Sequence, residues 1–331
     1  MKLATFEIPT PAGPLRRLGA AVDDSVVDLA AAYTAYLDRT DPGCDADRLA
    51  ALLLPPDMTS FLGSGGLGRS AAERAIETAA TTDDARGART RYRVPVGASG
   101  DEIRLLAPVA RPRVLRDFLT FEGHMKQAFK ALGRADPISP FWYQVPAYYK
   151  GDPDTVVGPD ASVQVPQYCE QFDFELELAM VVGRRGKNIA KADAPRYIAG
   201  YTIWNDFSAR DQQMKEGPLG MGPGKAKDFD AGNAIGPYLV TADEIDPDGL
   251  RMIARVNGET WTDSTSAGRQ FSFPDLIAHV SQAETIHPGE VWGSGTVTGG
   301  SGLELGRWLK PGDVVELEIE GIGVLRNRVV R

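Results

Sequence analysis

Cysteine and histidine are scarce in this chain of 331 residues. Its only cysteines, Cys44 and Cys169, are isolated from each other and form no C-x-x-C pair. A disulfide framework and a zinc knuckle are therefore excluded, and a reducing cytoplasm is the expected location. Only three histidines are present, so each is a candidate for a chemical role.

Long apolar runs and excess positive charge are also lacking. No apolar stretch approaches the about 18 residues that a membrane helix requires. Glu7, Pro9 and Pro11 interrupt the N-terminus before the apolar region of a signal peptide could form. We therefore expect neither export nor membrane insertion. The formal net charge is -9, from 36 Lys and Arg against 45 Asp and Glu, and this field would repel a nucleic-acid backbone.

The length favours one large domain or two unequal ones. Short strand-like and helical segments alternate over the first 80 residues, which predicts a small α/β domain. From 81 to 112 the sequence is rich in Arg, Gly, Thr and Pro, as is typical of a connector that holds one strand at most. We place the boundary near residue 105, with a small N-terminal α/β domain and linker at 1–105 and a larger second domain at 106–331.

The second region is predicted to be mainly β, so the fold class is α+β. Asn257-Gly258 predicts a tight hairpin, because this dipeptide tolerates the positive φ of a type I′ turn. The clearest helices are expected at 120–132 and at 274–284, the latter begun by Ser272. Strands are expected at 172–182, 198–204, 238–241, 251–256 and 314–320.

Acidic residues alternate with apolar ones in the segment FDFELELAMVV. In a strand, Asp173, Glu175 and Glu177 would share one face, with the two glutamates about 7 Å apart. Such a pair suits a hard divalent cation, which binds several oxygen ligands. A solvated strand face is the alternative interpretation, and it is the simpler one for Glu316, Glu318 and Glu320 further along the chain.

The segment YTIWNDFSARDQQ predicts a strand that ends at Asp206 and a helix that follows it. Ser208 and Asp211 have the spacing of a capping box. Arg210 and Gln213 are three residues apart and would share one helix face. A capped surface helix is the alternative interpretation of this segment.

Two glycine-rich segments invite comparison with nucleotide-binding loops. Residues 63–68 match a dinucleotide fingerprint, but no convincing strand precedes them, so a flexible loop is predicted. The loop with Lys225 and Lys227 is not a P-loop, since Leu219 and Ala226 occupy two of its signature positions. Of the histidines, His124 lies on a predicted amphipathic helix that Asp117 precedes, whereas His279 and His287 are assigned structural roles.

Several motifs read in order resemble the fumarylacetoacetate hydrolase family. The resemblance extends over roughly residues 110–331, and the N-terminal third resembles the small leading domain of longer family members. The motifs are Asp117 to His124, the Glu175-x-Glu177 strand, Asn205 to Asp211, Lys227 to Asp230, Ser294-Gly295-Thr296 and Leu303-Glu304-Leu305.

The resemblance implies a mixed β-roll or barrel of strands around a central site, and a homodimer. Four carboxylates would bind a divalent metal, Mg²⁺ or Mn²⁺ with Ca²⁺ as a third option: Asp117, Glu175, Glu177 and Asp206. His124 would be the catalytic base, paired with Glu304. Lys227, Arg210 and Gln213 would stabilise an oxyanion or enolate. Tyr149 and Thr296 would contact the substrate carboxylate.

The activity that the resemblance implies is metal-dependent hydrolysis of a carbon–carbon bond in an acylpyruvate or fumarylacetoacetate type of acid. A decarboxylase of 2-oxo acids or an enoate hydratase on the same fold is the alternative, because the same enolate serves all of them. The expected partner is a small anionic keto acid. Leu119 and Gly217 stand where the family's named enzyme has aromatic substrate contacts, so its substrate does not carry over.

Overall fold

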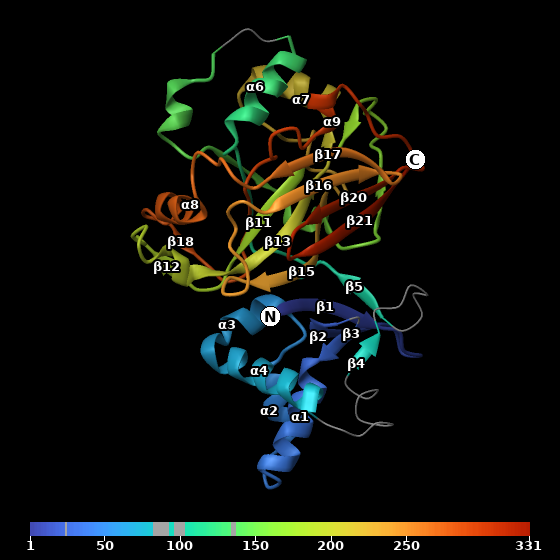
Figure 1. The fold of residues 1–331 in the computed structure, drawn as a ribbon, viewed down its shortest axis with the longest axis vertical. Helices are drawn as coiled ribbons and strands as arrows, with labels where there is room; N and C mark the ends of the chain where they lie inside the picture. Colours follow the sequence, from blue (N-terminus) through green and yellow to red (C-terminus); the bar gives the residue numbers. More distant parts are fainter. Residues whose placement is uncertain (24, 82–92, 96–102, 134–136) are drawn as a thin grey trace.

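The computed structural model describes residues 1–23, 25–81, 93–95, 103–133 and 137–331 (Figure 1). The N-terminal part begins with the antiparallel strands β1 (Lys2–Ile8), β2 (Leu15–Val22) and β3 (Ser25–Asp28). Helices α1 (Leu29–Thr40), α2 (Ala46–Leu53), α3 (Met58–Gly63) and α4 (Gly65–Thr81) follow. These elements agree with the short strand-like and helical segments expected over the first 80 residues.

The predicted flexible loop at 63–68 is wrong. Gly63 ends α3 and Gly65 begins α4, so the glycine-rich segment is a helix junction. Gly68 is buried, and a Cβ there would lie 1.8 Å from Ser64 Oγ. Close packing of these helices therefore explains at least one of the glycines, and the dinucleotide fingerprint has no structural counterpart.

The N-terminal strands extend the main sheet of the molecule. In the described part of the chain this sheet has twelve strands. Ten of them follow the order β4 (Arg93–Pro95), β3, β2, β1, β15 (Asn233–Thr241), β13 (Ile198–Asp206), β11 (Leu176–Val182), β19 (Val291–Gly293), β6 (Leu115–Phe118) and β7 (Tyr148–Gly151). The other two lie off this path, where β5 (Arg104–Leu106) pairs with β1 and β8 (Val156–Val157) pairs with β15. Lys2 pairs with Val240 and Leu3 with Leu239, which joins β1 to β15 (Asn233–Thr241). Strands β4 (Arg93–Pro95) and β5 (Arg104–Leu106) belong to the same sheet, and the proposed boundary at 105 lies within β5.

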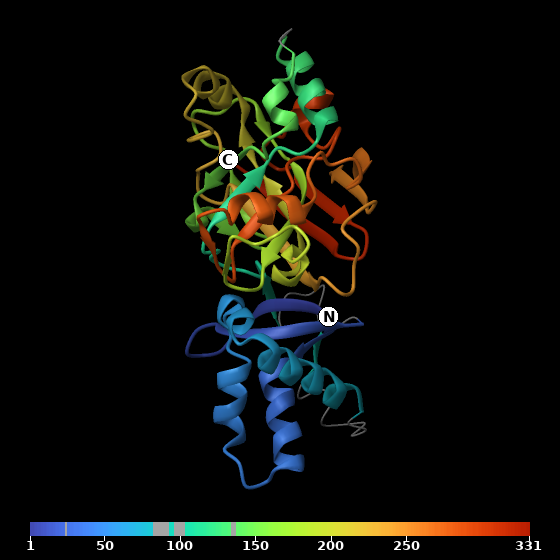
Figure 2. The same ribbon diagram turned by 90° about the vertical axis from the view of Figure 1, so that its left-hand side faces the viewer.

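The larger part, which follows the proposed boundary, contains a second sheet in the order β17-β16-β20-β21-β9, and this sheet packs against β11, β13 and β15 of the main one (Figures 1 and 2). The hairpin predicted at Asn257-Gly258 is confirmed, with φ values of 54° and 81°. The strands of this sheet are β9 (Ser162–Gln164), β16 (Arg251–Val256), β17 (Glu259–Thr265), β20 (Val314–Ile319) and β21 (Gly323–Val330).

The remaining elements complete the roll of strands. The strands are β6 (Leu115–Phe118), β7 (Tyr148–Gly151), β8 (Val156–Val157), β10 (Phe172–Asp173), β11 (Leu176–Val182), β12 (Gly186–Lys187), β13 (Ile198–Asp206), β14 (Ser208–Ala209), β18 (Thr285–Ile286) and β19 (Val291–Gly293). The helices are α6 (Glu122–Ala131), α7 (Arg210–Glu216), α8 (Phe273–Val280) and α9 (Gly302–Leu305), with short 3-10 turns η1 (Pro140–Tyr143), η2 (Pro153–Thr155), η3 (Ala194–Tyr197) and η4 (Gly217–Leu219).

Strand β11 lies between two apolar layers. Leu176 and Leu178 pack into the core shared with the second sheet, which includes Leu317. Ala179 and Val181 pack on the other side, in a cluster that also contains residues of the N-terminal helices. Both faces of the strand are therefore buried, unlike those of a surface strand.

The fold confirms the predicted class, an α+β protein that is mainly β. Ser272 caps α8 through a capping box with Asp275, which confirms that helix start as well. No helix among the described residues is long and apolar enough to cross a bilayer.

Candidate metal and acid–base site

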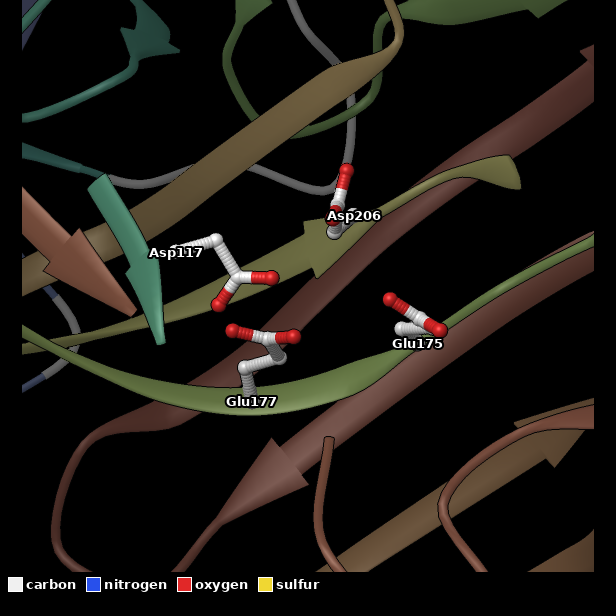
Figure 3. A group of neighbouring side chains, drawn as sticks. All are labelled: Asp117, Glu175, Glu177 and Asp206. Carbon is white, nitrogen blue, oxygen red and sulfur yellow. The ribbon is translucent and has the colours of Figure 1, made fainter. Parts of the chain in front are cut away.

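Four acidic side chains converge in the interior of the larger part (Figure 3). Asp117 comes from β6, Glu177 from β11 and Asp206 from the end of β13, while Glu175 immediately precedes β11. One oxygen of each lies within 4.8 Å of the others. Because Glu175 is 5 % exposed and Glu177 fully buried, the solvated-face interpretation is wrong for this pair. Glu316 and Glu318 are half-buried on β20, where a solvated face is observed.

Oxygen atoms in this cluster lack the partners that burial demands. Asp117 Oδ1, Glu177 Oε2 and Asp206 Oδ1 are buried and accept no hydrogen bond from the described residues. Buried acceptors of this kind are costly unless something satisfies them. A hard divalent cation is bound by several carboxylate oxygens, and these three atoms fit that requirement.

The electrostatics of the cluster also favour a bound cation. Burial, followed by the charge of Asp206, raises the pKa of Asp117 well above its usual value. Burial and the charge of Asp117 do the same to the pKa of Glu177. Burial raises the pKa of Asp206 to about 6, although Lys227 opposes the shift. Without a cation, these carboxyl groups therefore hold protons more strongly than exposed ones.

Lys227 bridges two members of the cluster. Its Nζ lies 2.6 Å from Glu175 Oε2 and 2.6 Å from Asp206 Oδ2. Burial alone would lower the pKa of this ammonium group, but the charges of Asp206 and Glu175 outweigh burial and raise it. Lys227 is therefore a fixed cation at neutral pH.

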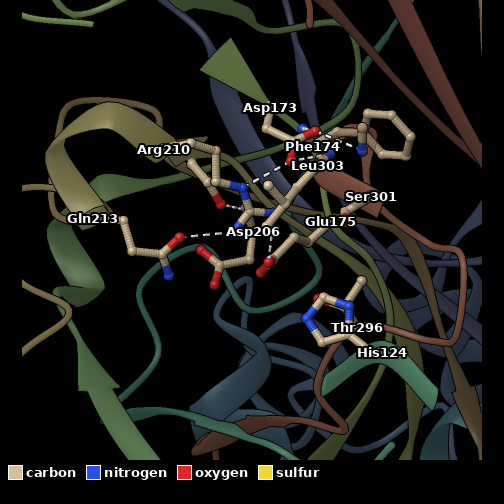
Figure 4. Close-up of polar contacts among 12 residues, drawn as sticks. His124, Asp173, Phe174, Glu175, Asp206, Arg210, Gln213, Thr296, Ser301 and Leu303 are labelled. Carbon is tan, nitrogen blue, oxygen red and sulfur yellow. Dashed lines mark hydrogen bonds and ion pairs between the residues drawn. The ribbon is translucent and has the colours of Figure 1, made fainter. Parts of the chain in front are cut away.

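Arg210 forms the second cationic link. Its Nε donates to Asp173 Oδ2 at 2.7 Å, and NH2 lies 2.7 Å from Glu175 Oε1. NH1 donates to Gln213 Oε1 at 2.9 Å, which confirms that Arg210 and Gln213 share a helix face (Figure 4). Although burial acts to raise the pKa of Glu175, Lys227 and Arg210 together lower it below its usual value.

The start of α7 differs from the prediction. Ser208 does not cap the helix, because its Oγ donates to the carbonyl of Asp206 at 3.0 Å. Helix α7 begins at Arg210 without a side-chain cap, so the capping box with Asp211 is wrong. Since Arg210 is only 3 % exposed, the surface-helix alternative is wrong as well.

His124 and Glu304 meet although they are far apart in the sequence. His124 Nδ1 lies 3.0 Å from Glu304 Oε2, in a contact that is not aligned as a hydrogen bond. Glu304 is fixed independently, because Oε1 accepts from Gly299 N at 2.9 Å and Oε2 accepts from Ser301 N and Oγ at 3.1 and 2.9 Å. The pair predicted by resemblance is thus brought together, with the carboxylate already oriented by the start of α9.

Tyr149 and Thr296 both contact the carboxylate cluster. Tyr149 donates to Asp206 Oδ2 at 2.5 Å, and Thr296 Oγ1 lies 3.5 Å from Glu177 Oε1. Burial and then the charge of Asp206 raise the pKa of Tyr149 well above its usual value. Both residues line the same cavity as His124. Their contact with the carboxylate of a substrate stays a prediction.

Asp173 is a residue of this site that the sequence analysis did not select. Its fully buried carboxylate accepts from Gly302 N at 2.7 Å and Leu303 N at 3.0 Å, in addition to Arg210 Nε (Figure 4). It thereby joins the start of the helix that holds Glu304 to the arginine that holds Glu175. The available signal was a third acidic residue in the alternating segment FDFELEL.

Residues 113–330 match the family described as Fumarylacetoacetate (FAA) hydrolase C-terminal. The chain belongs to the fumarylacetoacetate hydrolase family. This confirms the family resemblance found in the sequence.

Relatives in this family match the whole chain. Fumarylacetoacetate hydrolase domain-containing protein 2 of Pongo abelii is 34 % identical over 333 residues, covering all of this chain and 92 % of its own length. Human oxaloacetate tautomerase FAHD2A, a mitochondrial protein, is 33 % identical with the same coverage. The N-terminal part is therefore shared with these relatives.

Solved structures have the same fold. A putative HpcE protein from Mycobacterium smegmatis superimposes with a TM-score of 0.70 at 27 % identity, covering 98 % of this chain and 99 % of that one. Maleylpyruvate hydrolase from Sphingobium sp. SYK-6, solved with manganese(II) and pyruvate, has a TM-score of 0.69 at 21 % identity, covering 100 % and 99 %. At that identity the second likeness shows the fold alone.

Proposed function

We propose that this protein interconverts the keto and enol forms of a small 2-oxo acid. The observation that carries the proposal is the His124–Glu304 pair, which stands beside four buried carboxylates at one cavity. Tautomerisation needs one group that moves a proton and a positive environment for the oxygen. Full-length relatives named oxaloacetate tautomerases, 32 to 33 % identical to this chain, support the same chemistry.

The proposed reaction is a single proton shuttle. The imidazole of His124 takes a proton from carbon 3 of the acid, and the electron pair of that bond forms the double bond between carbons 2 and 3. The same proton then returns to the oxygen on carbon 2, which yields the enol, and the reverse sequence regenerates the ketone. Glu304 orients the ring and stabilises it while it carries the proton.

The four carboxylates would hold Mg²⁺ or Mn²⁺. A divalent cation bound there would supply positive charge that stabilises negative charge on a substrate oxygen. Lys227 and Arg210 keep Glu175 ionised, and Lys227 also holds Asp206 in place. Tyr149 and Thr296 border the cavity beside these ligands and would orient the substrate carboxylate.

Hydrolysis of a carbon–carbon bond in an acylpyruvate is the second candidate. The same pair is compatible with it, because an imidazole held by a carboxylate can also act as the general base that takes a proton from an attacking water. Water would add to the distal carbonyl, the bond between the acyl carbon and carbon 3 would break, and carbon 3 would take up the proton from His124.

One set of assays separates these reactions. Protein stripped of metal and resupplied with Mg²⁺ or Mn²⁺ is given oxaloacetate in D₂O, and exchange at carbon 3 is followed by NMR together with loss of the enol absorbance. We expect metal-dependent exchange without cleavage. Release of pyruvate and a carboxylic acid from acetylpyruvate would establish the hydrolase instead, and loss of CO₂ from oxaloacetate would establish a decarboxylase.

His124→Ala tests the assignment of the base. We expect exchange to fall by about 10² to 10⁴-fold, the usual contribution of a positioned acid–base group. Metal affinity should stay nearly unchanged, because His124 is not one of the four carboxylates. His279→Ala, on α8, is the matched control and should exchange at the wild-type rate. Equal activity of both variants would remove His124 from the mechanism.

A further inference from the structure

The cavity at this site has a polar side, formed by the carboxylate cluster and its neighbours, and an apolar side. It has a volume of about 790 Å³, within the range of about 300–1,000 Å³ in which sites enclose ligands much larger than a four-carbon acid. The polar groups that line it belong to the cluster already described and its neighbours. Much of the remaining wall is apolar and includes Leu119, Met125, Phe129, Leu132, Met214 and Leu303.

The cationic side chains that line the cavity already form ion pairs with carboxylates of the protein. Apart from His124, the cationic side chains lining it among the described residues are Lys227 and Arg210. Lys227 is bonded to Glu175 and Asp206, and Arg210 to Glu175 and Asp173. Neither is placed to neutralise a second carboxylate at the far end of a substrate.

The apolar wall decides which far end is favoured. A carboxylate placed against it would lose part of its hydration without gaining a cationic partner, which is costly. An alkyl chain would instead remove apolar surface from water, and each buried methylene strengthens binding by about fourfold. The wall therefore discriminates between charged and apolar far ends.

We propose that the preferred substrate is a monocarboxylic 2-oxo acid whose far end is an apolar chain of several carbons. This rests on the proposed function, since the 2-oxo acid group is taken to lie at the carboxylate cluster. The relatives' names specify oxaloacetate, a dicarboxylic acid, so the inference separates this chain from them in substrate while keeping the chemistry.

The test compares chain lengths in two assays on metal-loaded protein. Exchange at carbon 3 is measured for 2-oxobutanoate, 2-oxohexanoate, 2-oxooctanoate and oxaloacetate. Binding is measured by calorimetry with two acids that cannot enolise because carbon 3 carries two methyl groups and no hydrogen, 3,3-dimethyl-2-oxooctanoate and the dicarboxylic acid 3,3-dimethyloxaloacetate. We expect kcat/KM to rise with chain length, and at least a tenfold preference for the eight-carbon acid over oxaloacetate in exchange, with the same order in binding.

Two variants test the wall itself. Met214 lies on α7 and is 44 % exposed, so Met214→Arg adds a cation at the cavity with little risk to folding. Leu119→Arg adds one at a half-buried position. Each should shift the preference toward oxaloacetate by about tenfold, the effect of one well-placed charge. Leu67→Arg, at a 73 % exposed position on α4, is the control for net charge and should leave the preference unchanged.

The outcomes separate the two proposals. A preference for oxaloacetate in both assays, or no gain with chain length, would overturn the substrate class while leaving tautomerisation intact. Absence of exchange with every acid, together with tighter binding of the longer probe, would overturn tautomerisation and support the substrate class.

Discussion

At the scale of single residues, Asp173 shows how a charge can organise a site without touching the substrate. It binds the start of α9 and Arg210 at once, so it fixes both the acid–base pair and one metal ligand. Partners that orient ligands in this way typically contribute 10- to 100-fold to metal affinity or activity. Asp173 is therefore a positioning residue.

Asp173→Asn should weaken Mn²⁺ binding and lower kcat by about 10- to 100-fold each, while KM changes little. The substitution keeps the size of the side chain but places an amide nitrogen against groups that donate hydrogen bonds. Mn²⁺ titration followed by EPR and steady-state kinetics measure the two effects. Asp263→Asn, which breaks an exposed ion pair with Arg251, is the control. A variant that lost only thermal stability would show that Asp173 is merely structural.

The pKa shifts of the cluster predict how metal binding depends on pH. Asp117 and Glu177 have raised pKa values, and that of Asp206 is about 6. These carboxyl groups take up protons as the pH falls, and a cation must displace those protons. We expect Mg²⁺ affinity to fall steadily from pH 8 to pH 6, with proton release on binding. Calorimetry in buffers of different ionisation enthalpy measures this, and a constant affinity would contradict the shifts.

At the scale of secondary-structure elements, the short helix α9 has little freedom to move. A Cβ on Gly302 would lie 2.2 Å from the carbonyl oxygen of Arg307 and 2.5 Å from Asp173 Oδ1. The capping box of Ser301 and Glu304 closes the same turn. The helix therefore places Glu304 through close backbone packing.

Gly302→Ala should reduce the free energy of unfolding by about 1–3 kcal/mol, the usual cost of forcing extra volume into a packed interior. It should also lower activity, because α9 carries Glu304. Urea unfolding and the exchange assay measure both effects. Gly63→Ala is the matched control, since an added Cβ at Gly63 meets no atom within 4 Å. Wild-type stability in Gly302→Ala would contradict the close packing.

At the scale of the whole molecule, the N-terminal part and the larger part share one sheet and one apolar cluster. Strand β1 pairs with β15, and Leu3 and Leu29 pack in the same cluster as Val181 and Trp204. One sheet and one apolar cluster therefore extend across the boundary proposed at residue 105.

Removal of residues 1–105 should produce a fragment that does not stay folded and monodisperse. The deletion would expose the edge of β15 and the apolar face formed by Val181, Trp204, Ile235 and Leu239. Unpaired strand edges and large apolar patches promote aggregation. Light scattering and binding of a hydrophobic dye measure this, with the full chain as control. A soluble fragment that unfolds cooperatively would show that residues 106–331 form an independent domain.

The sequence by itself determined most of the local structure and the family. Apolar alternation and turn residues predicted the strands of the N-terminal part, β13, β16 and β20, because these patterns depend on near neighbours. The order of the motifs predicted the family and the four acidic residues. Prediction of local structure failed where two local hydrogen bonds compete. The Ser208 hydroxyl donates to the Asp206 carbonyl instead of capping a helix.

Tertiary structure alone decided which acidic residues lie in water and which form the site. Glu175 and Glu318 have similar alternating neighbours, but only Glu175 lies next to Lys227 and Arg210 inside the roll of strands. The apolar cavity wall and the link through Asp173 were also invisible, because both depend on contacts between distant segments. Burial turns an ordinary charged strand into a candidate metal site, and burial is a property of the whole fold.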